Sequence, residues 1–406
     1  MLQPQAQSSS EAATSSPAFP LLIALAGLLV LIILLLTPSS LPRLAGLDLA
    51  ASDIRTALFS ARADKDHPQI VVVSVGPRAR TPTSFASGLA RDRLAQLVDT
   101  IDGAGARAIG LDIALLRPTE PEHDTALHVA LRDAKAAVVL AAADERERLT
   151  ADERGYQVAF FAAVGRTAGF RMLQREPDGV VRYHAGAALD TRYQQSFPLL
   201  LARTVKSGTA STMGRIAWLQ PSDAAHPLGW LLDWSGRPPF MQVTGEDLLD
   251  KDRRDLRASL RGKIVLIGDN SVSGERYRTP LTALSGEEAS DVMIHAQAVA
   301  QLLDGRTLAS LPPDVVKLLL LAFGCAGGLF GWWMHGRRHF VLACLLSLLA
   351  FLVVDAVVVS RMQLILPLIS CLIAWTAGIL AGHHFGLAND RLVKRAATRW
   401  PSGRIA

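Results

Sequence analysis

Cysteine is scarce in this chain of 406 residues, and its positions are restricted. Cys325, Cys344 and Cys371 all fall inside long apolar runs toward the carboxyl end. The more polar stretch of residues 37–311 has no cysteine, which excludes a disulfide framework and a thiolate metal site there. This stretch is long enough to bury a core, so we expect its stability to come from apolar packing.

The motifs of several common enzyme classes are also missing. The sequence has no G-x-x-x-x-G-K-[ST] loop, no H-E-x-x-H pair, no C-x-x-C pair and no G-x-S-x-G elbow. We therefore expect no catalytic residues, no cofactor and no metal ligands, and interpret the protein as a non-enzyme. An exported hydrolase with an unrecognised site is the weaker alternative.

The chain carries no strong excess of one charge, since its formal net charge is +5. Much of the positive excess lies in the short segment 335–339 and in the tail 387–406, both next to apolar runs. The Lys/Arg bias of loops on the cytoplasmic side of membrane proteins explains it there. We therefore do not expect nucleic-acid binding.

Long apolar runs are what the sequence does have. They cover residues 17–36, 315–334, 340–360 and 362–382. Each is near the roughly 20 residues that a helix needs to cross a bilayer, so we predict four transmembrane helices. We interpret the first as an uncleaved anchor and not as a signal peptide, because residues 1–16 contain no Lys or Arg.

The basic segments predict the orientation of these helices. Segments 335–339 and 387–406 should be cytoplasmic. Crossing back from them places the N-terminus, which we expect to be disordered over residues 1–16, inside as well. Residues 37–311 then lie outside the cytoplasm, in the periplasm if the membrane is a bacterial inner membrane. The basic tail binds either anionic headgroups of the lipid bilayer or a partner, and both interpretations remain.

The pattern of residues 37–311 is typical of an α/β domain. Continuous apolar runs of strand length occur at 70–75, 108–113, 137–140 and 264–268. Apolar residues at helical spacing lie between them at 94–101 and 127–134. Strands that alternate with helices predict right-handed β-α-β units, hence a largely parallel or mixed sheet flanked by helices. A surface excursion is expected over 207–227.

Polar residues fall where such a sheet builds binding sites, at or beyond the carboxyl ends of its strands. Together they predict a crevice for a small charged or polar extracytoplasmic ligand. Each residue alone also fits a structural role, because Asp at strand ends commonly caps a turn or helix. The candidates are Arg91, Asp112, Asp124, Arg182, Asp269, Asn270 and His295.

Five segments in register carry a family resemblance. They are RDRLAQLVDTIDGAGARAIGLDI at 91–113, DGVVR at 178–182, LRGKIVLIG at 260–268, TP at 279–280 and IHAQ at 294–297. They resemble the type-2 CHASE family of bacteria, the cyclase/histidine-kinase-associated sensory extracellular domain, over about residues 53–308. The layout of one helix before the domain and three after it is similar too. The resemblance implies a sensor outside the cytoplasmic membrane, usually joined to a cyclase or kinase.

The chain departs from the family pattern near the presumed ligand site. Gly76 and Pro77 stand where an acidic residue is common, and residues 87–90 replace a Trp-Pro-Trp-Pro-like stretch. Glu275 stands where Asp is expected. The tail of about 20 residues is too short to fold as an effector, so we expect an unknown cytoplasmic effector in trans. The alternative from another class is a structural or assembly subunit that docks a periplasmic protein.

The second apolar run contains glycines spaced four apart, Gly324 with Gly328 and Gly327 with Gly331. This spacing permits close approach of helices. Two interpretations remain, self-association into a homodimer and packing against neighbouring helices of the same chain.

Overall fold

The protein is described by a computed structural model that covers residues 18–36, 42–59, 65–75, 90–188, 191–206, 229–234, 240–271, 274–306, 308–362 and 364–399. The chain divides into two compact units. One, the helical unit, comprises Met1–Asp48, Pro313–Asp355 and Pro367–Ala406; the other, the α/β unit, comprises Leu49–Pro312 and Ala356–Leu366. Each unit is treated by itself below.

The α/β unit is built on a six-stranded sheet in which every neighbouring pair is parallel. Its spatial order is β4-β3-β2-β8-β1-β7. The predicted α/β fold with a parallel sheet is confirmed. The strands are β1 (Ile70–Ser74), β2 (Ala108–Asp112), β3 (Ala137–Ala142), β4 (Thr167–Phe170), β7 (Met241–Thr244) and β8 (Ile264–Gly268).

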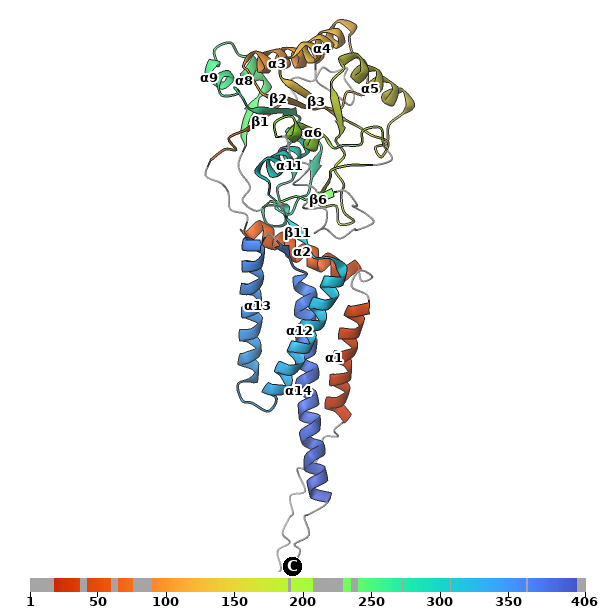
Figure 1. Ribbon diagram of the computed structural model, residues 1–406, viewed down its shortest axis with the longest axis vertical. Coiled ribbons are helices and arrows are strands. Elements are labelled where there is room, and N and C mark those ends of the chain that lie inside the picture. Colours follow the sequence, from red (N-terminus) through yellow and green to blue (C-terminus); the bar gives the residue numbers. More distant parts are fainter. Residues whose placement is uncertain are drawn as a thin grey trace, which may run out of the picture. The chain divides into compact units, whose positions relative to one another are not determined.

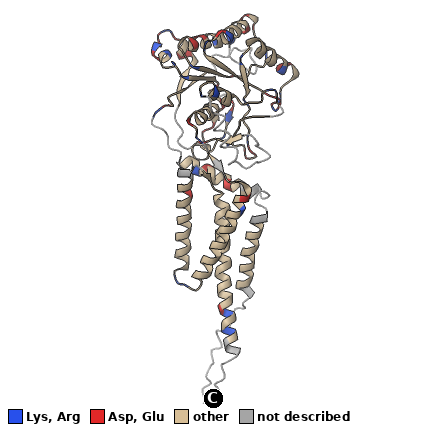
Figure 2. Ribbon diagram, in the orientation of Figure 1, with Lys and Arg blue, Asp and Glu red and all other residues tan. Residues whose placement is uncertain are grey.

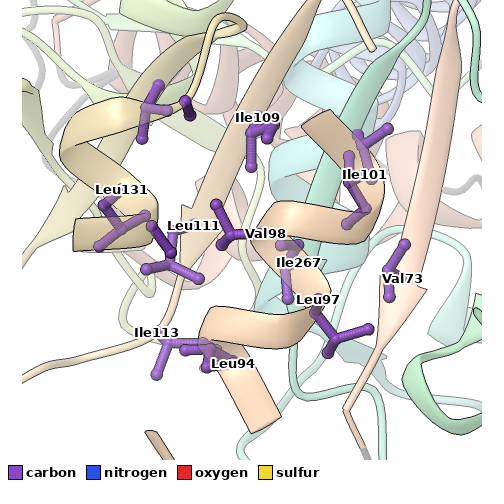
Figure 3. Close-up of a cluster of buried hydrophobic side chains, with 14 of the residues drawn as sticks. Val73, Leu94, Leu97, Val98, Ile101, Ile109, Leu111, Ile113, Leu131 and Ile267 are labelled. Carbon is purple, nitrogen blue, oxygen red and sulfur yellow. The ribbon is translucent and has the colours of Figure 1, made fainter. Parts of the chain in front are cut away.

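Helices cover both faces of this sheet (Figure 1). α3 (Arg91–Gly103), α4 (Pro121–Asp133) and α5 (Ala151–Val164) lie on one face, and α6 (Phe197–Arg203) and α11 (Asp291–Asp304) lie on the other. Successive side chains of a strand point to opposite faces, so β1 sends Val71 and Val73 to the first core and Ile70 and Val72 to the second. Figure 3 shows part of the first core, where Val73, Ile109, Leu111 and Ile267 of the strands meet Leu94, Leu97, Val98 and Ile101 of α3.

Short elements complete this unit. Two antiparallel pairs join β5 (Tyr183–Ala185) to β6 (Gly229–Leu231) and β9 (Arg276–Tyr277) to β10 (Ala289–Ser290), and β11 (Ala309–Ser310) pairs in parallel with β12 (Leu364–Ile365). The short helices are α8 (Gly245–Leu249), α9 (Arg254–Ala258) and α10 (Thr282–Ser285). α2 (Pro42–Phe59) precedes β1 in the chain, and the division between the two units falls within it, after Asp48. The excursion expected over 207–227 lies outside the described residues.

Within the described part of the chain, three helices are long and apolar enough to cross a membrane, by length and composition, and the prediction of four is wrong in this respect. They are α12 (Pro313–Met334), α13 (Phe340–Met362) and α14 (Leu368–Arg399), with apolar spans of Pro313–Met334, Phe340–Val358 and Leu368–Ala396. The first run does form an apolar helix, α1 (Ala18–Leu36), of which residues 20–33 count here as a shorter apolar helix and not as a fourth span. Figure 2 shows few charges on α1, α12 and α13.

The fourth run, expected to be helical over 362–382, is also shifted. Its first residues belong to the end of α13 and to β12, and α14 begins only after Pro367. The ring of a proline excludes the residue before it from helical geometry, which explains the delayed start. α14 then continues to Arg399 through much of the predicted basic tail, where Lys and Arg gather (Figure 2).

The glycines of α12 pack against α14 of the same chain. An added Cβ at Gly327 would collide with the backbone oxygen of Trp375, and one at Gly331 with that of Ile379. From the side of α14, an added Cβ at Gly378 would collide with the backbone oxygen of Gly324, and one at Gly382 with that of Gly328. Packing within one chain therefore accounts for the glycine face of α12. Self-association into a homodimer stays a prediction, but this face no longer supports it.

Candidate functional site

The seven candidate residues of the α/β unit do not line one crevice. The structure places Arg91 with Asp124, and it places Arg182 with acidic residues elsewhere. Asp269 lies in the turn after β8. Asp112 ends β2 at the carboxyl edge of the sheet and bonds to His295, and Asn270 follows Asp269 at the same edge, after β8.

Arg91 and Asp124 form a closed pair beneath the helices of the first face. Arg91 is 1% exposed, with its Nη1 3.6 Å from Asp124 Oδ1 and its Nη2 donating to the Arg117 oxygen. The guanidinium also lies 5.3 Å from the ring centre of Phe160. Burial raises the pKa of Asp124, but hydrogen bonds from Thr119 and the charge of Arg91 outweigh it, so the pKa is lowered. The pair joins α3, α4 and α5.

Arg182 is enclosed by carboxylates. Its Nε and Nη2 donate to the two oxygens of Asp53 at 2.9 and 2.6 Å, a bidentate pairing. Nη2 also donates to Asp178 at 2.6 Å, and Nη1 donates to Glu176. Burial raises the pKa of Asp53 and of Glu176, and the nearby arginine opposes this rise. With three acidic partners, Arg182 has no surplus charge to offer an anion.

Asp269 has a local role. Its Oδ1 accepts the backbone N–H of Ser271 at 2.8 Å, which is the geometry of an Asx turn. For Asp269, the turn-forming role that the sequence also allowed therefore fits better than ligand binding.

A buried polar network occupies the carboxyl edge of the sheet, around Asp112 and His295. Asp112 Oδ2 lies 2.6 Å from His295 Nδ1, and both side chains are fully enclosed. His295 Nε2 lies 3.0 Å from the backbone oxygen of Arg171, so both ring nitrogens face acceptors. Burial raises the pKa of Asp112, but the charge and hydrogen bond of His295 outweigh it and the pKa is lowered. α11 is thereby fixed to β2 and to the segment after β4.

Asp291 at the start of α11 extends the network. Its Oδ2 accepts from Arg171 Nη2 at 2.5 Å. Burial, together with the negative charge of Asp112, raises the pKa of Asp291 to about 6 despite the arginine. Complete burial, reinforced by the charge of His295, lowers the pKa of the neighbouring His184 to about 3, so that ring is neutral at ordinary pH. The opposite charges of the network compensate one another, so the network can hold the segments at the carboxyl edge of the sheet in place.

Asn270 leads from this network into an open hollow of about 440 Å³. Ser290 donates to Asn270 Oδ1 at 2.7 Å, and Asn270 Nδ2 donates to Gln242 at 3.0 Å. Ser290 directly precedes Asp291, so hollow and network meet at the start of α11. The lining residues are Ala57, Trp234, Phe240, Gln242, Asn270, Arg276, Thr279, Leu281, Leu284, Ser285, Glu287, Glu288, Ala289, Ser290, Met293 and Gln297.

Sequence reasoning missed several residues of this region. Arg171, Asp291 and Trp234 stand in no motif, and only the structure brings them to the edge. Gln297 was part of the IHAQ segment without a role. The spacing of His295, Gln297 and Gln301, polar residues within the apolar helix α11, was the signal that could have identified them, since buried polar side chains require partners.

Fold and site together define a class of protein: a parallel α/β domain with a polar edge and an open hollow, in a chain with long apolar helices that suggest membrane anchorage. A model of the CHASE2 domain matches residues 25–330. The match covers most of the chain, and this protein belongs to the CHASE2 domain family. Neither the comparison with curated proteins nor that with solved structures gives a match.

Proposed function

We propose that this protein is a membrane-anchored sensor of the bacterial inner membrane. Residues 37–311 lie outside the cytoplasm, where they bind a small ligand or a periplasmic partner. The signal passes through the apolar helices to a separate cytoplasmic effector. Membership of a sensor-domain family supports the sensing role, and the basic residues Arg337, Arg338, Arg391, Lys394 and Arg395 support the orientation.

The observation that carries the proposal is the bonding of α11. This helix is buried almost throughout, and its polar side chains hold segments on the second face. Gln297 Nε2 donates to the backbone oxygen of Asp233, and Gln301 Nε2 donates to that of Leu231. In the chain, only residues 305–312 separate α11 from α12. A ligand that binds two arrangements of α11 with different affinity therefore shifts the equilibrium between them.

The test is co-purification of the full chain from membranes with its cytoplasmic partner. The variant replaces Arg391, Lys394 and Arg395 by Ala, and the matched control replaces three exposed basic residues of the α/β unit, Lys251, Arg253 and Arg254, by Ala. We expect the partner to be lost with the first variant and retained with the control. A partner that is lost only with the control points to a docking subunit and contradicts the sensor proposal.

We also propose that the protein has no catalytic activity. The carboxylates and the histidine of the buried network bond to one another, which supports a structural role. Measurable hydrolytic turnover by the purified protein that disappears in Asp112→Asn and persists in Asp252→Asn would contradict this.

A further inference from the structure

Two polar atoms at the hollow lack partners. Trp234 and Gln297 line it and are 3% and 0% exposed. Within the described part of the chain, neither Trp234 Nε1 nor Gln297 Oε1 has a hydrogen bond. Gln297 Nε2 donates to the Asp233 oxygen at 2.7 Å, so the amide orientation leaves Oε1 as the atom that requires a donor. Such buried groups are unfavourable until something bonds to them.

These atoms specify the chemistry that would satisfy them. One is a donor and the other an acceptor, and a hydroxyl group can accept from the indole N–H and donate to the amide oxygen. The buried lining is uncharged, with Thr279 and Ser290 as further polar residues. The charged lining residues Arg276, Glu287 and Glu288 are partly or fully exposed. A charged ligand group at the buried end would therefore have no opposite charge.

The rest of the lining fits the same kind of molecule. Phe240, Leu281 and Met293 supply apolar surface for C–H groups, while Gln242 and Asn270 supply further uncharged polar groups. A volume of about 440 Å³ lies within the range of small-molecule sites. We propose that this hollow binds an uncharged polyhydroxylated small molecule, a sugar or a polyol. This inference rests on the proposed function, because it names the ligand class of the sensor.

Binding requires a side-chain movement. Trp234 Nε1 and Gln297 Oε1 are closed to solvent in this structure. Met293 is partly exposed, lines the hollow and precedes Gln297 by four residues on α11, so the two share a face of the helix. Methionine is unbranched and flexible, and its displacement opens the way to Gln297. Ligand binding is thus coupled to the side-chain packing of α11.

Titration calorimetry of the purified full chain tests the ligand class. The neutral probes are glycerol, myo-inositol and D-glucose, and the charged counterparts are D-gluconate and D-glucosamine. We expect saturable binding of at least one neutral probe. The charged counterparts should bind with an affinity at least about tenfold lower. Absence of saturation with every neutral probe, or tighter binding of a charged one, overturns the proposal.

Matched variants test the site. Trp234→Phe removes the indole donor at the hollow, whereas Trp230→Phe removes an equally buried, unpartnered donor that does not line it. Gln297→Met on α11 is paired with Gln157→Met, which changes an equally buried glutamine of α5 that does not line the hollow. We expect the first member of each pair to weaken binding by about ten- to a hundredfold and the second to leave it unchanged.

The two pairs are independent, so one insoluble variant does not remove the test. Equal weakening within both pairs would overturn the assignment of the hollow. Retention of the cytoplasmic partner without any polyol binding would refute the ligand class alone. Polyol binding without a cytoplasmic partner would refute the sensor proposal alone.

Discussion

At the scale of single residues, charged side chains in the α/β unit have partners that decide their role. Arg182 illustrates this, because its pairing with Asp53, Glu176 and Asp178 makes it a structural cation and not a ligand anchor. A buried ion pair contributes little over an apolar replacement, but removal of one partner leaves the other charge uncompensated.

We predict that Arg182→Ala destabilises the protein by about 3–5 kcal/mol, because the carboxylates of Asp53 and Glu176 remain buried without a cation. Thermal unfolding of the purified full chain measures this. The control is Arg132→Ala, which breaks a solvent-exposed pair with Asp133 and should leave the unfolding temperature unchanged. Equal effects of the two substitutions would contradict the structural role of Arg182.

A second prediction concerns Asp291, whose pKa is raised from 3.8 to about 6 by burial and by Asp112. Between these values the folded protein holds a proton that the unfolded chain has released, so stability falls as pH rises. Asp291→Asn mimics the protonated form. Its advantage over the natural protein should grow by about 2 kcal/mol from pH 4 to pH 6 and level off above about pH 7.

The measurement is unfolding free energy at several pH values for the natural protein, Asp291→Asn and the exposed control Asp252→Asn. A constant difference between the natural protein and Asp291→Asn across this range would refute the raised pKa.

At the scale of elements, helix contacts in the helical unit depend on small residues. Glycines of α12 and α14 interlock backbone to backbone, while Asp48 accepts the backbone N–H groups of Ile369 and Ser370 at 2.7 and 3.1 Å. These N–H groups at the start of α14 have no partner within the helix, so the carboxylate stabilises this helix end.

Two alanine substitutions in α12 provide a matched test of this packing. Gly331→Ala places a Cβ against the Ile379 backbone and should destabilise the protein by about 1–3 kcal/mol. Gly328→Ala places one 3.7 Å from the Gly378 oxygen, an ordinary contact, and should be tolerated. Thermal unfolding in one detergent compares the two. Greater sensitivity at Gly328 would show that α12 packs through a different face.

At the scale of the whole molecule, the proposed orientation predicts where labels reach the chain. In a background with the three cysteines replaced by Ser, Lys251→Cys should react with a membrane-impermeant maleimide on intact spheroplasts. Arg337→Cys, at a similarly exposed position, should react only after permeabilisation, because the proposed orientation places its basic loop in the cytoplasm. The reverse pattern would invert the topology.

The parallel sheet could be predicted because strands that are buried on both faces have continuous apolar sequences, as in 70–75 and 264–268. α5 was missed although Thr150 and Glu153 form a capping box at its start, a signal visible in the sequence. α2 was missed because Asp48, Ser52, Asp53 and Arg55 interrupt any apolar stripe.

The sequence by itself determined the class of fold, the apolar helices and the family, because these depend on local periodicity, length and ordered motifs. Only the tertiary structure decided which polar residues meet. Asp112 and His295 bond across 183 positions, and Trp234 reaches the hollow of Gln297 from a separate segment. Strand order and helix crossovers set such partners, and no local pattern encodes them. For the same reason, Arg182 and Arg91 form structural ion pairs although the sequence made them ligand candidates. Trp234 and Gln297, which no sequence motif indicated as ligand-binding residues, line the candidate binding site.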